Sequence, residues 1–291
     1  MPSSDLKLLV LGTIQDAGSP HIACKKDCCK NLFKTKNRSR LVTSLGIVDS
    51  KNKQTYLFEA SPDMTFQMKM LNKAAKFEHN PIPDGIFLTH AHIGHYTGLM
   101  YLGKEATDAK QVPVFAMPRM KTFLEQNGPW SQLVKRKNIT IKSLTNDSIT
   151  QLSKSLSVTP ISVPHRDEFS ETVGFRIQGP NKSVLFIPDI DKWAKWDKDI
   201  TEVIKKVDYA FIDGTFFSAN EISGRNINDI PHSLISESME LFKGLSEIEK
   251  SKIHFIHFNH TNPILNIESK ERALVKANGF KIAKQGKLFS L

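Results

Sequence analysis

The 291-residue sequence has few cysteines and no long hydrophobic run. Its three cysteines, Cys24, Cys28 and Cys29, lie within six positions, and an odd number so close together is a poor basis for disulfide pairing. A reducing compartment or a metal clip explains them better. No apolar stretch approaches the ~18 residues that a membrane span needs, and no basic flank precedes the apolar run near the N-terminus. We therefore expect a cytoplasmic protein that does not cross a membrane.

Acidic residues are outnumbered, because the chain has 40 lysines and arginines against 30 aspartates and glutamates and a net charge of +10. That charge permits attraction to phosphates, polyanions or acidic metabolites. The lysines are nevertheless scattered, and the densest groups, at 34–40 and 134–138, contain no interleaved aromatic residues. A solvated basic surface is therefore favoured over a nucleic-acid site. Nothing in the sequence indicates an oligomeric state.

Hydrophobic patterning predicts one α/β domain over residues 1–291, since no repeat, low-complexity tract or Pro/Gly/Ser-rich linker divides the chain. Short β-rich runs alternate with helix-like stretches such as 62–76, and helices and strands alternate regularly from residue 192. Two sheets covered by helices are expected from this order. The predicted strands are 6–12, 44–49, 54–60, 85–90, 112–117, a hairpin over 172–191, and segments within 139–163, 206–215 and 252–261.

The segment LTHAHIGHYTGL, residues 88–99, places three histidines within six positions after an apolar run. His90 and His92 face one way on an extended segment, and His95 returns to the same point once the chain turns through Gly94. Three imidazoles that converge on one point are what a zinc-type site requires. Separate surface histidines on a polar loop are the alternative, and their clustering argues against it.

Further metal-ligating side chains follow other predicted strands. Because the loops at strand ends often carry the function of an α/β fold, we predict that these side chains join the histidine loop. They are His165, Asp189, His257 and His260.

This order of ligands resembles the metallo-β-lactamase superfamily over nearly the whole chain. Within it, the segments LGTIQDAGSPHIACKKDCC, HYTGLMYLGKEA, VPVFAM, VDYAFIDGTFF and HTNPIL are similar to the pyrroloquinoline-quinone synthesis protein B group. The resemblance implies an αββα sandwich of two mixed sheets flanked by helices, with a metal centre between the upper edges of the sheets. It assigns the first metal site to His90, His92 and His165, the second to His95 and His257, and a bridging role to Asp189.

The histidine loop departs from both family patterns. Gly94 stands where the superfamily usually has an aspartate, so we expect one tight zinc and a weak or absent second ion, unless Asp191, His260 or a water replaces the carboxylate. Iron and manganese are the alternatives to zinc. The quinone-synthesis group often lacks the two histidines present here as His90 and His92, which makes the chain look more like a hydrolase.

A metal held by histidines and Asp189 lowers the pKa of a bound water toward about 7, which predicts a hydrolase acting on a phosphodiester, an ester or a lactone. His232 resembles the histidine of a His-Ser/Thr motif in tRNase Z that acts on the leaving group, so it is a candidate general acid. Ser233 beside it is equally a candidate helix cap. Asp213 either orients a ligand histidine or ends a buried strand.

The cysteines form a candidate structural zinc clip. Cys24, Cys28 and one or both of Cys29 and His21 are the predicted ligands. The resemblance adds a distant histidine, for which His254 is the candidate. Free, partly buried thiols are the alternative, because Cys-x3-Cys-Cys departs from the common Cys-x2-Cys spacing.

Two functions compete with hydrolysis. A redox role in quinone-cofactor synthesis, with iron in place of zinc, is favoured by the resemblance of the N-terminal and DGTFF segments. A non-enzymatic protein that binds nucleic acid or another partner is permitted by Gly94 and by the net charge of +10. Salt-sensitive binding without turnover would favour this last hypothesis.

Overall fold

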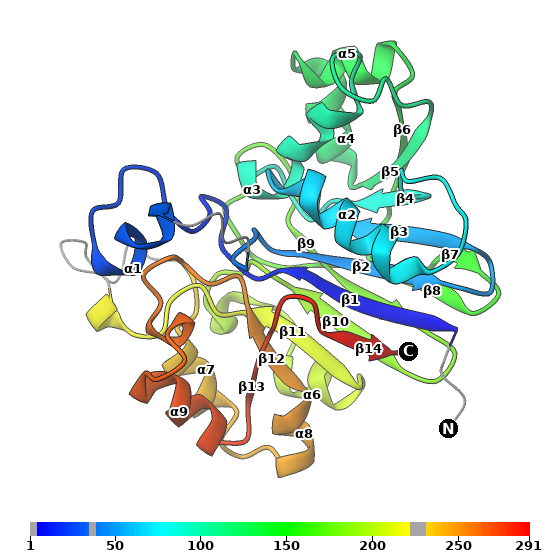
Figure 1. The fold of residues 1–291 in the computed structure, drawn as a ribbon. Helices are drawn as coiled ribbons and strands as arrows, with labels where there is room; N and C mark the ends of the chain where they lie inside the picture. The colour runs from blue at the N-terminus through cyan, green and yellow to red at the C-terminus, as the bar shows by residue number, and fades with distance from the viewer. Residues whose placement is uncertain (1–4, 35–38, 222–230) are drawn as a thin grey trace.

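Two seven-stranded sheets form the centre of the computed structural model, which describes residues 5–34, 39–221 and 231–291 (Figure 1). The first sheet has the order β14 (Leu288–Ser290), β1 (Leu6–Gly12), β2 (Ser44–Asp49), β3 (Gln54–Phe58), β4 (Gly85–Phe87), β5 (Val112–Ala116) and β6 (Ile139–Ser143). The second has the order β13 (Lys281–Ile282), β12 (Ile253–Ile256), β11 (Tyr209–Asp213), β10 (Ser183–Ile187), β9 (Val173–Gln178), β8 (Leu156–Ser162) and β7 (Thr150–Ser153).

Both sheets are mixed. In the first, strands β3 to β6 pair in parallel, whereas β14, β1, β2 and β3 pair antiparallel. In the second, strands β10 to β13 pair in parallel, whereas β7, β8, β9 and β10 pair antiparallel. Parallel strands bring their carboxyl ends to one edge, so each sheet presents several strand ends and their loops on the same side.

The two sheets face each other across an aromatic core. Phe58 and Phe87 of the first sheet stack with ring centroids 4.8 Å apart, and Phe175 of the second sheet contacts both edge-on at 5.6 Å. All three side chains are fully buried. This buried aromatic interface sets the relative position of the two sheets, and with it the distance between their strand ends.

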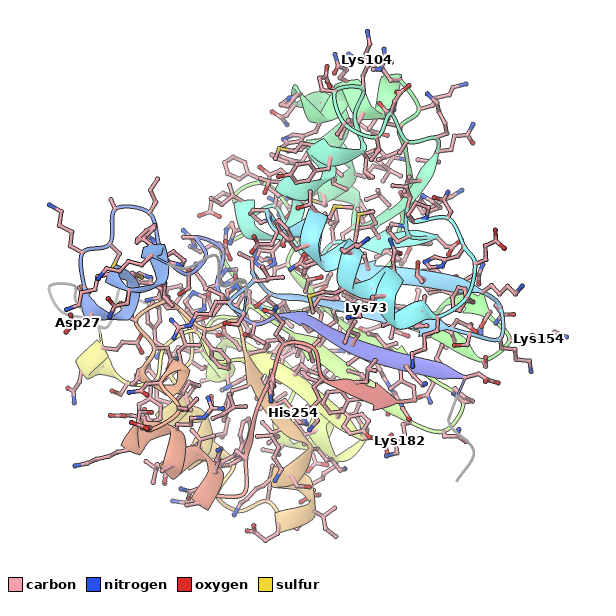
Figure 2. All side chains as sticks on the ribbon, in the orientation of Figure 1. Asp27, Lys73, Lys104, Lys154, Lys182 and His254 are labelled. Atoms are coloured by element: carbon pink, nitrogen blue, oxygen red, sulfur yellow. The ribbon has the colours of Figure 1, made fainter. Side chains whose placement is uncertain are left out.

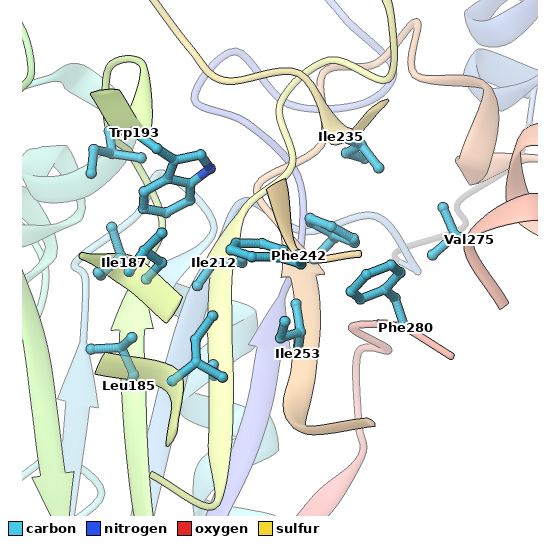
Figure 3. Close-up of a cluster of buried hydrophobic side chains, with 14 of the residues drawn as sticks. Leu185, Ile187, Trp193, Ile212, Ile235, Phe242, Ile253, Val275 and Phe280 are labelled. Atoms are coloured by element: carbon cyan, nitrogen blue, oxygen red, sulfur yellow. The ribbon is translucent and has the colours of Figure 1, made fainter. Parts of the chain in front are cut away.

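Helices cover the outer face of each sheet, which gives four layers. The helices α2 (Met64–Ala75), α4 (Pro118–Gln126) and α5 (Trp130–Lys135) cover the first sheet, and α6 (Ile200–Lys205), α7 (Ile235–Leu241), α8 (Glu247–Lys252) and α9 (Lys270–Ala277) cover the second. Figure 3 shows Trp193 and Phe242 packed beside Ile212 of β11 in this outer layer. The predicted αββα sandwich of two mixed sheets is confirmed.

The strands that precede the candidate ligands are shorter than predicted. The expected strand 85–90 ends at Phe87, and the expected strand 252–261 ends at Ile256. The chain leaves the sheet at both points to aim polar side chains inward, and His257 does so with a left-handed backbone, φ +67°. Strand ends are therefore where the sequence pattern and the structure differ.

The lysines labelled in Figure 2 lie far from one another. Lys104, Lys154 and Lys182 stand at well-separated places on the molecule. Within residues 5–34, 39–221 and 231–291, no helix is both long and apolar enough to span a bilayer.

His254 of β12 belongs to the aromatic core. Its ring stacks on Phe211 with centroids 4.9 Å apart and meets the edge of Phe289 at 5.2 Å. Burial, together with the charges of Lys287 and Lys281, lowers the pKa of His254 to about 3. The imidazole is therefore held neutral near neutral pH.

We expect His254 to make the fold acid-sensitive. A histidine of ordinary pKa in the unfolded chain binds a proton below about pH 6.5, whereas the folded protein resists it until about pH 3. The contribution of His254 to the free energy of unfolding is fully present well above about pH 6.5. It falls by about 2 kcal/mol between pH 7 and pH 5. Urea unfolding of His254→Phe at both pH values should show a correspondingly smaller loss than the unsubstituted protein. Equal losses in the two proteins would contradict this account.

Candidate metal centre

The predicted ligands converge at the carboxyl ends of the strands. His90 and His92 follow β4, His165 follows β8, and Asp189 follows β10. The ligand atoms of these four residues all lie within 4.8 Å of one another, so the structure brings together the set proposed for the first metal site. His92 immediately precedes the short helix α3 (Ile93–Tyr96), which carries His95 back toward the same point.

Hydrogen bonds orient the imidazoles of the first group. His90 Nε2 lies 2.8 Å from His92 Nδ1 and 3.4 Å from Asp189 Oδ2. His165 turns Nε2 toward Asp189 Oδ1 at 3.3 Å, while its Nδ1 lies 3.1 Å from the Asp191 carboxylate and donates to it. Such a partner fixes the tautomer, so that the other nitrogen can bind a metal.

A second group shares Asp189 and includes a residue that the sequence did not reveal. His95, His257, Asp189 and Asp16 place their ligand atoms within 4.8 Å of one another. Asp16 Oδ1 lies 3.0 Å from His95 Nε2 and 3.1 Å from His257 Nε2. The signal for Asp16 was its place shortly after the strand 6–12, in the same position relative to a strand as the other ligands.

The residues expected to replace the missing carboxylate lie elsewhere. Asp191 accepts hydrogen bonds from His165 Nδ1 and, at 2.9 Å, from Lys195 Nζ. It therefore orients the His165 ring from the side away from Asp189. His260 lies beside the cysteines. The carboxylate that lies beside His95 and His257 is that of Asp16, because the turn after β1 places Asp16 directly against Gly94.

Charge is concentrated in this buried centre. Burial lowers the pKa of His95, but the carboxylates of Asp16 and Glu59 outweigh it and raise that pKa well above its ordinary value. Burial raises the pKa of Asp189, but His165, His257 and His232 together hold it well below its usual range. Burial and the neighbouring His95 lower the pKa of His90.

The donor set fits one or two divalent metal ions. Among the buried side-chain atoms of the described chain, His165 Nε2 and Asp189 Oδ1 make no hydrogen bond although they face each other at 3.3 Å. Buried polar atoms without partners are costly, and a cation between imidazole nitrogens and carboxylate oxygens would satisfy them. Imidazole and carboxylate ligands suit zinc, iron and manganese.

His232 lies directly beside the shared carboxylate. Its Nδ1 is 2.8 Å from Asp213 Oδ2 and 3.1 Å from Asp189 Oδ1. Asp213 is fully buried and also accepts from the hydroxyl of Thr215, whose oxygen lies 2.9 Å from His257 Nδ1. Asp213 therefore positions His232 directly and His257 through Thr215.

Ser233 does not cap the following helix. Its hydroxyl accepts from the backbone of Trp193 at 3.0 Å, and α7 begins at Ile235 with Leu234 in the N-cap position. The Glu237 carboxylate accepts from the Leu234 backbone instead. The alternative explanation of the His-Ser pair as a capping motif is therefore wrong for Ser233.

An arginine stands at the mouth of the first group. Arg166 follows the ligand His165, is largely exposed, and places Nη2 3.4 Å from His92 Nε2. The Glu168 carboxylate lies 3.7 Å from the same nitrogen of His92. The guanidinium and the Glu168 carboxylate, 3.9 Å apart, thus both lie beside His92 at the exposed side of the first group.

The cysteines form a separate group with a histidine other than the one expected. Cys24 and Cys29 each lie 3.9 Å, sulfur to sulfur, from Cys28, close to the edge of about 3.8 Å in a zinc tetrahedron. His260 completes this set within 4.8 Å, and the ring of His21 packs on His260 at 4.2 Å. His254, the earlier candidate, is instead held in the aromatic core by β12.

Comparisons with known proteins support the family and the fold. Residues 54–258 match the family model described as the β-lactamase superfamily domain. The chain is 25% identical over 303 residues to the coenzyme PQQ synthesis protein B of Methylorubrum extorquens, covering 97% of this chain and 98% of that protein. It superposes on Zn²⁺-bound PqqB from Methylobacterium extorquens with a TM-score of 0.81 and 22% identity, over 98% and 100% of the two chains. A diphosphatase from the PhnP family gives a TM-score of 0.64 and 18% identity, over 98% and 97%.

We expect the cysteine group to hold a zinc ion independently of the histidine centre. With His260 as its expected nitrogen ligand, His260→Ala should lose one zinc equivalent, measured by plasma mass spectrometry on protein purified without added metal. His79→Ala is the matched control, since His79 bonds to Asn72 outside both groups and should keep all of its zinc. A His260→Ala protein with unchanged zinc would favour free thiols.

Proposed function

The chain belongs to the metallo-β-lactamase superfamily, and on that premise we propose that it is a metal-dependent hydrolase that cleaves a phosphodiester, an ester or a lactone. The observation that carries the proposal is that two ligand groups share one carboxylate, Asp189. His90, His92 and His165 would hold one ion, and Asp16, His95 and His257 would hold the other. The chain acts as one domain in this proposal.

A divalent ion bound there would supply Lewis acidity and lower the pKa of a coordinated water to about 7. Paired metal sites are common where phosphoryl groups are transferred, because they stabilise both the attacking and the leaving oxygen. Arg166 lies 3.4 Å from His92, and the Glu168 carboxylate, 3.9 Å from the guanidinium, offsets its charge. The paired ligand groups therefore carry the preference for a phosphodiester over a neutral ester or lactone, and zinc, with manganese as the alternative, is the metal of this proposal.

His232 is the residue placed to protonate the leaving group. Its Nδ1 is engaged by Asp213 at 2.8 Å, so the ring is held in one orientation and Nε2 is the nitrogen left to meet a leaving group. A carboxylate partner on one nitrogen supports the charged form of the ring, from which the other nitrogen can give up a proton. Asp213 is the positioning residue in this arrangement.

A redox role in quinone-cofactor synthesis is the second candidate. It is favoured by similarity to PQQ synthesis protein B over 97% of this chain. Iron bound to the purified protein would support it, whereas zinc would support hydrolysis, because zinc has no redox chemistry. A partner-binding role has no specific contact in its favour.

We expect cleavage of bis(4-nitrophenyl) phosphate to depend on metal. Dialysis against a chelator should abolish cleavage, and added zinc or manganese should restore it. Added metal should not restore cleavage by the His165→Ala variant, because this substitution removes the proposed ligand that Asp191 orients. His79→Ala is the matched control, since His79 bonds to Asn72 away from the centre and should leave turnover unchanged. Turnover that survives complete metal removal would refute the hydrolase proposal.

We expect His232→Ala to affect poor leaving groups selectively. General acid catalysis contributes roughly 10²–10⁴-fold, so kcat for a dinucleotide substrate with an alkoxide leaving group should fall by that order. Turnover of the 4-nitrophenyl ester should fall far less, because nitrophenolate leaves without a proton. An equal loss on both substrates would mean that His232 acts only by holding Asp189, 3.1 Å away.

A further inference from the structure

We propose that Asp16 and Gly94 are an exchanged pair: Asp16 supplies the carboxylate of the second metal site, and Gly94 leaves the space that Asp16 occupies. The inference rests on the metal centre of the proposed function but not on any particular reaction. It reverses the expectation that the second ion binds weakly for want of an acidic residue at position 94.

Asp16 has the position of a ligand. A single oxygen, Oδ1, lies between the Nε2 atoms of His95 and His257 at 3.0 and 3.1 Å, and the side chain is 12% exposed. His257 binds Thr215 through its other nitrogen, so its Nε2 is the atom turned toward Asp16. Three ligand atoms from three separate segments thus point at one place, and Asp189 Oδ2 lies 3.8 Å from His95 Nε2 on the same side.

Gly94 is explained by space rather than by backbone conformation. It lies within helix α3, and its φ is not in the left-handed region. A Cβ atom at position 94 would stand 2.5 Å from Asp16 Cα and 2.7 Å from both Asp16 Cβ and Cγ. These distances are far inside van der Waals contact, and the nearest atom is backbone, so it cannot rotate away. A side chain at position 94 and the present position of Asp16 exclude each other.

The turn that carries Asp16 is fixed to the strand end that carries His257. The Gln15 backbone donates to Phe258 at 2.9 Å, and the Gly18 backbone donates to Gln15 at 2.9 Å across the turn. Phe258 in turn donates to Thr13 at 2.8 Å. Asp16 therefore reaches the centre on a rigid support, as a ligand requires.

The exchange leaves both sites with a full set of ligands. The first has three imidazoles and Asp189, and the second has two imidazoles, Asp16 and Asp189. The second site therefore keeps the carboxylate that Gly94 lacks, supplied from the N-terminal segment, and it should retain its ion.

Manganese binding to metal-free protein tests the ligand role. Mn²⁺ is the probe because thiolate ligands such as the cysteine group do not favour it, and electron paramagnetic resonance counts the free ion directly. The unsubstituted protein should bind two ions, and Asp16→Asn, which keeps the shape of the side chain, should weaken one of them at least about tenfold. Asp197→Asn removes an exposed carboxylate outside the metal groups and should still bind two. An Asp16→Asn protein that binds two ions like the control would overturn the inference.

Reciprocal substitution tests the exchange itself. Gly94→Asp alone should lose one bound manganese because its side chain collides with Asp16. The double variant Asp16→Gly, Gly94→Asp should regain it, because the change at position 16 removes the colliding Cβ and Cγ atoms, and the wider backbone freedom of glycine lets its Cα shift by the remaining distance. A folded double variant, checked by circular dichroism, that binds one ion would contradict the exchange. A protein that binds two ions and cleaves no substrate would refute the hydrolase proposal while leaving this inference intact.

Discussion

The centre depends on the contacts between the buried Asp189 carboxylate and the imidazoles around it. Asp189 is 3% exposed, and burying an unpaired carboxylate would cost several kcal/mol. His90, His95 and His257 lie near one oxygen, and His165 and His232 lie near the other, so five imidazoles surround the carboxylate. The two sheets must meet in one fixed relation for these five side chains to surround a residue at the end of β10, and the aromatic interface between the sheets provides that relation.

Outer partners hold the imidazoles in place. Asp191 orients His165, and Thr215 orients His257 while Asp213 orients Thr215. Each partner leaves one ring nitrogen turned inward, which is how a site selects a metal through geometry as well as ligand type. Asp213 contacts both the His232 side and the His257 side, so the candidate acid and the second metal group share one support.

Much of the fold and the first ligand group could be predicted from the sequence, because strand periodicity and the order of histidines are local patterns. The strands 6–12 and 44–49 were predicted with the bounds that the structure has. Asp16 was missed because Gly94, at the position of the superfamily's usual aspartate, suggests that the site has lost a carboxylate. Only the three-dimensional structure shows that the turn carrying Asp16 packs against Gly94. His260 and His254 could not be told apart by spacing, because strand β12 buries one among aromatic rings and the following turn presents the other to the cysteines.

Two of the four members of the second ligand group, Asp16 and His257, come from the two segments that also carry the cysteine group. Asp16 lies on the turn that leads to Cys24, and His257 precedes His260 on the loop after β12. Backbone hydrogen bonds from Gln15 to Phe258 and from Phe258 to Thr13 join these segments between the two groups. The first ligand group takes its histidines from the loops after β4 and β8, which have no part in the cysteine group. The N-terminal segment therefore contributes a side chain, Asp16, to the second ligand group and none to the first.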